Sequence, residues 1–297
     1  MTREIRTGSL QMIAAMLISG TIGALVVFSQ QPVTNVVFWR CVFAAITLFI
    51  LGLMSGNWRS HLNRRVVLIA ALGGVALVVN WLLLFAAYSR TSIGLATVLY
   101  NTQPLMLVGM GVFILKEKVS RSKWLWLGAS FAGMLLVFSS GFNHSGSNGW
   151  LTGITMALGA AFFYALTALI IRQLKGVPAQ QIALVQVAVG TLMLLPLVDF
   201  QQHMTFTHWG IVATLGILHT GMMYQLLYGA IQKLPTSITA SLSFIYPIVA
   251  VVVDRFVFDH SLSPIQFFGG AMILLAAAGI NLGWGEKRTT KAALAKG

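Results

Sequence analysis

Long apolar stretches alternate with short polar breaks along the whole chain of 297 residues. An α-helix needs about 20 apolar residues, with a range of about 17 to 25, to cross the hydrocarbon core of a bilayer. Ten stretches of about this length are present, over residues 10–29, 33–54, 66–88, 92–114, 124–142, 150–172, 179–198, 208–231, 236–257 and 264–284. No break has room for a separate soluble domain. The pattern predicts an all-α membrane protein with ten transmembrane helices.

Composition supports this class. Hydrophobic residues make up 57% of the chain and charged residues only 8%, against roughly a quarter charged in a soluble domain. So few polar residues could not cover a soluble core. The first segment follows Arg3 and Arg6 and could be a signal peptide, but its length and the missing A-x-A site favour an uncleaved helix. The only cysteine, Cys41, cannot form an intramolecular disulfide.

The basic residues are distributed unevenly between alternate loops. If the N-terminus is cytoplasmic, the inside loops hold most of the 19 lysines and arginines. These are Arg3, Arg6, Arg59, Arg64, Arg65, Lys116, Lys118, Arg121, Lys123, Arg172, Lys175, Lys233, Lys287, Arg288, Lys291 and Lys296. The outside loops hold only Arg90 and Arg255, and Arg40 lies inside the second segment. Because cytoplasmic loops carry the excess of basic residues, both termini are predicted to be cytoplasmic.

Two distant stretches have the same pattern. VLYNTQPLMLVGMGVFILKEKVSRSKW starts at Val98 and SLSFIYPIVAVVVDRFVFDHSLSPIQF at Ser241, and they align without gaps when Pro104 is placed on Pro247. Apolar sequences can align by chance, but the paired prolines and the pattern around them favour a true repeat. The charged break is basic in the first copy (KEKVSRSK) and carries acids in the second (DRFVFDHS).

An inverted repeat explains the reversed charge. With five helices in each copy, an odd number, the second copy enters the membrane upside down, so its charged break lies on the outer face. We therefore predict two inverted-topology five-helix repeats, residues 1–147 and 148–297, which form one transport unit. Such repeats are typical of secondary transporters, whose substrate sites lie at the midplane between the halves.

Three motifs carry a resemblance to a known family. They are VVFWRCVFAAITLFIL in the second predicted helix, FILKEKVSRSKWLWLGASFAGMLLV after the fourth, and FVFDHSLSPIQFFGGAMILLAAAGINL after the ninth. Over nearly its whole length the chain resembles the drug/metabolite transporter (DMT) superfamily of the EamA type, and most of all its YddG-type amino-acid exporters. The resemblance implies a central cavity lined by helices one, three, four, six, eight and nine. Asp259 and His260 stand where the family usually has Glu, which leaves the role of an acid there open.

Helix breaks are expected at the two repeated prolines. Pro104 and Pro247 each lie about eleven residues into a predicted helix, and each frees the backbone carbonyl four residues earlier, on Tyr100 and Ser243. A transporter can hold an ammonium or hydroxyl group at such a break. The alternative is that a neighbouring helix satisfies the freed carbonyls.

The candidate substrate-binding residues are polar and aromatic residues deep in the helices that the resemblance assigns to the cavity. They are Asn80, Trp81, Tyr100, Asn101, Gln103, Tyr164, His219, Tyr224, Gln225, Tyr228, Ser243 and Tyr246. Aromatic rings with one polar atom suit a site that packs an apolar side chain and orients a polar head group. Packing and interhelical hydrogen bonds are the alternative for each of them. His219 could also relay protons.

Arg40 is the one cation well inside a predicted helix. It could reach the membrane surface, cap backbone carbonyls or receive a substrate carboxylate. Its position in a family-wide signature favours a structural role.

No acid lies at the predicted midplane, and all six lie at or near helix ends: Glu4, Glu117, Asp199, Asp254, Asp259 and Glu286. An exporter that swaps cations for protons through a membrane carboxylate would need one there. We therefore expect export of small amino acids, aromatic ones included, and related metabolites by alternating access, as uniport or exchange. The alternatives are a proton-coupled exporter of other metabolites or drugs, a lipid-translocating protein and a channel.

Enzyme motifs are missing. The sequence has no H-E-x-x-H, no Cys/His metal spacing, no phosphate-binding glycine loop followed by Lys-Ser/Thr and no G-x-S-x-G. We expect no catalytic residues, no metal and no cofactor. The expected partners are a small-molecule substrate and the lipid bilayer, without nucleic acid. The expected state is a monomer or weak homodimer, as a multi-pass protein of a bacterial-type inner membrane.

Overall fold

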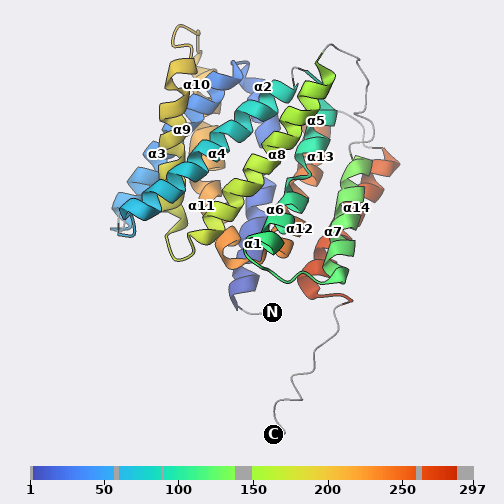
Figure 1. Ribbon diagram of the computed structural model, residues 1–297. Coiled ribbons are helices and arrows are strands. Elements are labelled where there is room, and N and C mark those ends of the chain that lie inside the picture. The colour runs from blue at the N-terminus through green and yellow to red at the C-terminus, as the bar shows by residue number, and fades with distance from the viewer. Residues whose placement is uncertain are drawn as a thin grey trace.

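The structure is a computed structural model that describes residues 3–56, 60–88, 90–91, 93–137, 149–258 and 263–285. Within these ranges every regular element is a helix, and the helices pack side by side as one bundle (Figure 1). The all-α prediction is therefore confirmed for the described part of the chain. Residues 259 and 260, the acid and histidine of the second charged break, lie outside it.

Each half of the chain supplies a series of helices. The first half contains α1 (Arg3–Ser19), α2 (Ile22–Ser29), α3 (Val33–Met54), α4 (Arg64–Tyr88), α5 (Ile93–Tyr100), α6 (Gln103–Phe113) and α7 (Arg121–Val137). The second contains α8 (Trp150–Gln173), α9 (Ala179–Leu194), the short η2 (Leu195–Leu197), α10 (Phe206–Gly216), the π-helix η3 (Ile217–Met222), α11 (Met223–Lys233), α12 (Thr236–Ser243), α13 (Ile245–Phe258) and α14 (Pro264–Leu282).

Eight helical segments of the described chain are long and apolar enough to cross a membrane. They are Arg3–Ser29, Val33–Met54, Arg64–Ala87, Trp150–Gln173, Ala179–Leu197, Phe206–Lys233, Thr236–Val257 and Pro264–Leu282. The predicted fourth and fifth spans correspond to α5 with α6 and to α7, which has 17 residues. These two are not among the eight, so ten crossings remain a prediction.

Local start and stop signals account for several helix ends. Ser263 and Thr205 each form a capping box with the residue three positions later, at the starts of α14 and α10. Proline precedes α3, α9 and α12. The last helix ends at Gly283, whose φ of 70° is the left-handed conformation that glycine adopts without strain. These signals lie in the polar breaks of the sequence, so the breaks position the helices.

Helix breaks lie next to both repeated prolines. A turn at Asn101 and Thr102 separates α5 from α6, just before Pro104 in the first turn of α6. A second turn, at Phe244, separates α12 from α13, which has Pro247 in its first turn. A third break, at Gly20 and Thr21 between α1 and α2, has no proline.

The same helix contacts recur when the two halves are exchanged. The third helix of each half packs on the first helix of the other, α4 on α8 and α11 on α1. The second helices, α3 and α9, pack together, and so do the fifth, α7 and α14. Glycines let α7 and α14 approach closely, because a Cβ on Gly133 would lie 2.7 Å from the Gly269 carbonyl oxygen. Helix α1 begins and α14 ends at the same end of the bundle (Figure 1).

Candidate functional site

Tyrosines from four parts of the chain meet inside the bundle. Tyr100 of α5 packs edge-on against Tyr164 of α8, with ring centroids 6.1 Å apart. Tyr224 and Tyr228, one turn apart on α11, have centroids 5.1 Å apart. Tyr164 lies close enough to Tyr224 and to Tyr246 of α13 for their hydroxyls to interact electrostatically. Five of the six tyrosines thus form one group, which we call the tyrosine cluster.

Gln186 of α9 extends this cluster. The Tyr228 hydroxyl donates a hydrogen bond to Gln186 Oε1, and both side chains are buried. The Nε2 of Gln186 is buried without a hydrogen-bond partner. Gly73 of α4 makes room for this side chain, since a Cβ on Gly73 would overlap Nε2, and Gly74 lies against the Gln186 backbone. The sequence did not identify Gln186 as a site residue, because the family resemblance does not assign the seventh helix to the cavity. A glutamine deep in an apolar segment is the signal that could have identified it.

Arg40 of α3 lies beside the cluster. Its side chain is only 8% exposed, and its Nε donates a hydrogen bond to the Thr220 hydroxyl. Its guanidinium carbon lies 5.2 Å from the ring centroid of Trp81, which is a cation–π contact. Thr220 lies four residues before Tyr224 of the cluster. A single cation therefore adjoins an aromatic, hydroxyl-bearing surface.

The π-helix η3 positions the residues of the eighth span that face Arg40. Within it the Thr220 hydroxyl donates to the Leu215 carbonyl at 3.0 Å and accepts from Arg40. His219 Nε2 lies 2.8 Å from the Thr21 hydroxyl, and its Nδ1 lies 3.3 Å from the Thr214 carbonyl. Single-turn π-helices inside α-helices often occur at functional sites. The sequence did not reveal this one.

The remaining candidates mostly bond to backbone. Four of them donate to carbonyl oxygens: Asn80 to Ala160 at 2.7 Å, Asn101 to Thr97 at 2.8 Å, Ser243 to Thr239 at 2.9 Å and Gln225 to Gly221 at 3.5 Å. Gln103 is buried in the first turn of α6. The Oδ1 of Asn80 is buried and unpaired. Asn101, Ser243 and Gln225 each bond to a carbonyl four residues earlier in the chain, so their polar side chains are satisfied without a substrate.

An apolar cavity of about 210 Å³ lies between α3, α4 and α9. Trp81 lines it together with Val37, Val78 and Leu194. Trp81 therefore contacts both the Arg40 guanidinium and an apolar space.

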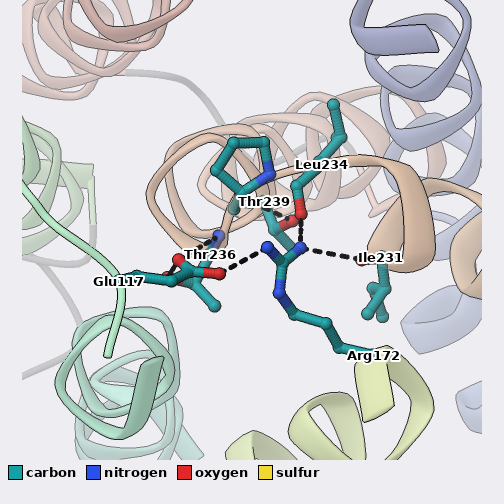
Figure 2. Close-up of polar contacts among 7 residues, drawn as sticks. Glu117, Arg172, Ile231, Leu234, Thr236 and Thr239 are labelled. Carbon is teal, nitrogen blue, oxygen red and sulfur yellow. Dashed lines mark hydrogen bonds and ion pairs between the residues drawn. The ribbon is translucent and has the colours of Figure 1, made fainter. Parts of the chain in front are cut away.

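A second polar group joins the two halves of the chain, and Figure 2 shows its contacts. Glu117, in the loop after α6, forms an ion pair with Arg172 in the last turn of α8. The Glu117 carboxylate also accepts hydrogen bonds from the backbone N–H and the hydroxyl of Thr236, at 3.1 and 2.6 Å. Arg172 donates to the Leu234 carbonyl. We call these four residues the inter-repeat cluster.

The start of α12 explains the position of the Glu117 carboxylate. Thr236 is the first residue of α12, and the first N–H groups of a helix have no partner within the helix. A carboxylate satisfies them and interacts favourably with the positive end of the helix dipole. The sequence placed Glu117 in a loop but did not predict its partners, which lie 55 to 119 positions further along the chain and have no pattern that links them to it.

The model of the EamA-like transporter family matches the chain twice, over residues 6–139 and 151–282. The chain belongs to the EamA-like transporter family. The resemblance to the drug/metabolite transporter superfamily, seen first in three motifs, is thereby confirmed.

Proteins that are named as transporters are similar to this EamA-like chain. The uncharacterized transporter YxxF of Bacillus subtilis (strain 168) is 30% identical over 258 residues, which cover 85% of the chain and 82% of the relative. The threonine/homoserine exporter RhtA of Escherichia coli (strain K12) is 24% identical over 228 residues, or 76% of the chain and 75% of RhtA. One crystal structure has a TM-score of 0.80 at 16% identity and covers 93% of this chain and 97% of that one. That likeness shows the fold.

The family match and the similar proteins together identify the class of this protein. The EamA-like chain is a transporter rather than an enzyme, and it is a multi-pass protein of the inner membrane. Its substrates are small molecules.

Proposed function

We propose that this EamA-like transporter exports small amino acids, aromatic ones included, and related metabolites by alternating access, as a uniporter or an exchanger. The observation that carries the proposal is the tyrosine cluster beside Arg40. Aromatic faces attract an ammonium group, tyrosine hydroxyls exchange hydrogen bonds with polar groups, and the rings pack apolar side chains. An amino acid presents all of these features. RhtA, which is similar over most of the chain, is named as an exporter of threonine and homoserine.

The topology of the proposal has ten transmembrane helices, with both termini in the cytoplasm. Residues 1–147 and 148–297 form two inverted repeats of one transport unit, which acts as a monomer or weak homodimer. The double match of the family model supports this arrangement, and so do the contacts that recur when the halves are exchanged. Sixteen basic residues in alternate loops support the orientation.

The distribution of carboxylates favours an uncoupled cycle. Among the acids whose side chains the structure describes, Glu4 lies in the first turn of α1, Glu117 pairs with Arg172, and Asp199 lies in the turn after η2. None of them contacts the tyrosine cluster through an ion pair or hydrogen bond. A proton-coupled exchanger of cations needs a membrane carboxylate that binds cation and proton in turn. His219, held between two threonine oxygens, is the described side chain on which a proton-coupled alternative would depend.

The test is transport by the purified protein in liposomes. Uptake of labelled threonine and phenylalanine is measured with and without unlabelled amino acid inside, and with and without a pH gradient. The proposal expects saturable uptake that internal amino acid accelerates and the gradient leaves unchanged. A rate that follows the pH gradient and is lost in His219→Gln would support the proton-coupled alternative. Flux no higher than in empty liposomes would refute amino-acid transport.

Variants of the tyrosine cluster connect the flux to the site. Tyr224→Phe removes a hydroxyl and keeps the ring, whereas Tyr224→Ala removes both. If the cluster binds substrate, the alanine variant raises KM more than the phenylalanine variant does. Trp124→Phe, at a side chain that is 43% exposed on the bundle surface, is the matched aromatic control and should leave KM unchanged.

A further inference from the structure

We propose that Arg40 recognises a carboxylate on the transported solute, so that carboxylate-bearing molecules are transported and their neutral analogues are not. This inference rests on the proposed function and specifies its substrate class. Arg40 is the only cation in the middle of a described helix.

The environment of Arg40 lacks a counter-ion. The side chain is more than nine-tenths buried, yet no described carboxylate pairs with it. Its one hydrogen bond runs from Nε to the neutral hydroxyl of Thr220. A charge removed from water without a partner is strongly unfavourable. The site as described is therefore electrostatically incomplete.

The other roles open to Arg40 do not fit its contacts. An arginine that reaches the membrane surface would be exposed, but Arg40 is not. An arginine that caps a helix would donate to backbone carbonyls, as Arg172 does to Leu234, yet Arg40 donates to no carbonyl of the described chain. The structural role that the sequence favoured would rest on the contacts with Thr220 and Trp81, and these leave the positive charge of Arg40 without an anion. A ligand would supply the anion that these two uncharged partners do not.

The two terminal nitrogens of Arg40 are available to bind an anion. Thr220 holds Nε, and the indole of Trp81 lies against the guanidinium. Neither terminal nitrogen of Arg40 forms a hydrogen bond within the described chain. Neither belongs to the fully buried side-chain atoms that lack a partner in the described chain, so both nitrogens retain accessible surface. A carboxylate binds such a pair of nitrogens through two parallel charge-assisted hydrogen bonds.

The neighbours of Arg40 restrict the anion. One guanidinium neutralises one negative charge, and no second described cation lies beside it, so a monoanionic carboxylate fits better than a phosphate dianion. Thr220, which accepts the hydrogen bond from Arg40, lies four residues before Tyr224 on the eighth span. A solute whose carboxylate binds Arg40 would then place its remaining groups against the tyrosine cluster.

The test compares matched ligands rather than absolute activity. In counterflow of labelled phenylalanine, the competitors are phenylalanine, phenylalaninamide and phenethylamine, which differ in the carboxylate. Loss of a charge-assisted pair corresponds to about tenfold or more in apparent affinity. We expect the wild type to prefer phenylalanine over both analogues by at least about that factor.

Variants assign the preference to Arg40. Arg40→Gln should remove the preference, so that phenylalanine and its amide compete equally, and Arg40→Lys should keep part of it because a single ammonium replaces the fork. Thr220→Val retains the charge but frees Nε, and should weaken phenylalanine binding while leaving the preference in place. Arg121→Gln removes an exposed arginine at the start of α7 and is the matched control.

Two results would overturn the proposal: equal competition by phenylalanine and its amide in the wild type, or an unchanged preference in Arg40→Gln. If no amino acid is transported, the proposed function fails separately. The inference is then tested by ligand-induced thermal stabilisation of the purified protein with short monocarboxylates and their amides. Stabilisation by the acids alone that disappears in Arg40→Gln supports it, and no acid-specific stabilisation overturns it. If Arg40→Gln does not fold, Arg40→Lys and the wild-type panel decide.

Discussion

The inter-repeat cluster allows a quantitative test of how the two halves are held together. Glu117→Gln removes the charge but keeps the shape of the side chain. The Glu117 and Arg172 side chains are 16% and 22% exposed, so their interaction lies between an exposed pair, worth about 0.2–1 kcal/mol, and a buried pair whose disruption costs about 3–5 kcal/mol.

Two details of the cluster narrow this range. Glu117 also accepts from the first N–H of α12, and because glutamine keeps an acceptor oxygen, weakening of this helix cap costs at most about 1 kcal/mol. Arg172 keeps its bond to the Leu234 carbonyl in the variant, so it is not left wholly unpaired. We therefore expect Glu117→Gln to lower the free energy of unfolding by about 2–3 kcal/mol, of which about 1–2 kcal/mol is coupling to Arg172.

The assay is equilibrium unfolding in mixed micelles of dodecylmaltoside and dodecyl sulfate, followed by tryptophan fluorescence. A double-mutant cycle with Glu117→Gln and Arg172→Gln isolates the coupling energy. Glu4→Gln, at an exposed acid of α1, is the control and should change stability by less than about 0.5 kcal/mol. A coupling energy below about 0.3 kcal/mol would show that the ion pair contributes nothing and that this reasoning is wrong.

The same variant tests the transport cycle. Leu234 lies against Gly8 near the start of α1, so the cluster is at the end of the bundle that the proposed topology places in the cytoplasm. In the proposed alternating-access cycle the two halves separate at this end, which would separate Glu117 from Arg172. Glu117→Gln should therefore favour the inward-open state, which is measured as faster labelling of a cysteine introduced at the cytoplasmic end of α12 in a Cys41→Ala background.

Other contacts lead to two further predictions. Tyr228→Phe leaves the buried Gln186 amide without its remaining hydrogen bond, so stability should fall by about 1–3 kcal/mol in the same micelle assay; an unchanged value would place water at that amide. Gly133→Val forces α7 away from the Gly269 carbonyl and should cost about 1–3 kcal/mol. Gly128→Val, where a Cβ meets no neighbour, should be close to neutral, and equal losses in the two variants would contradict the close-approach argument.

Helix positions were largely predictable from local pattern. The predicted segment 33–54 coincides with α3, and the segment 150–172 ends one residue before α8 does. Apolar length and turn residues are local properties, and lipid requires backbone groups to bond within each helix. The helix breaks beside Pro104 and Pro247 also lie where a missing N–H predicts them.

Composition and pattern also determined the class of the protein, since a chain with so few charges can be solvated only by lipid. The residues that meet at the site depended on tertiary packing. Arg40 bonds to Thr220, 180 positions away, and Tyr228 bonds to Gln186 on a helix that the family resemblance did not assign to the cavity. Such partners are set by which helix faces meet and by where glycines permit close approach, and these are properties of the assembled bundle that no single segment encodes.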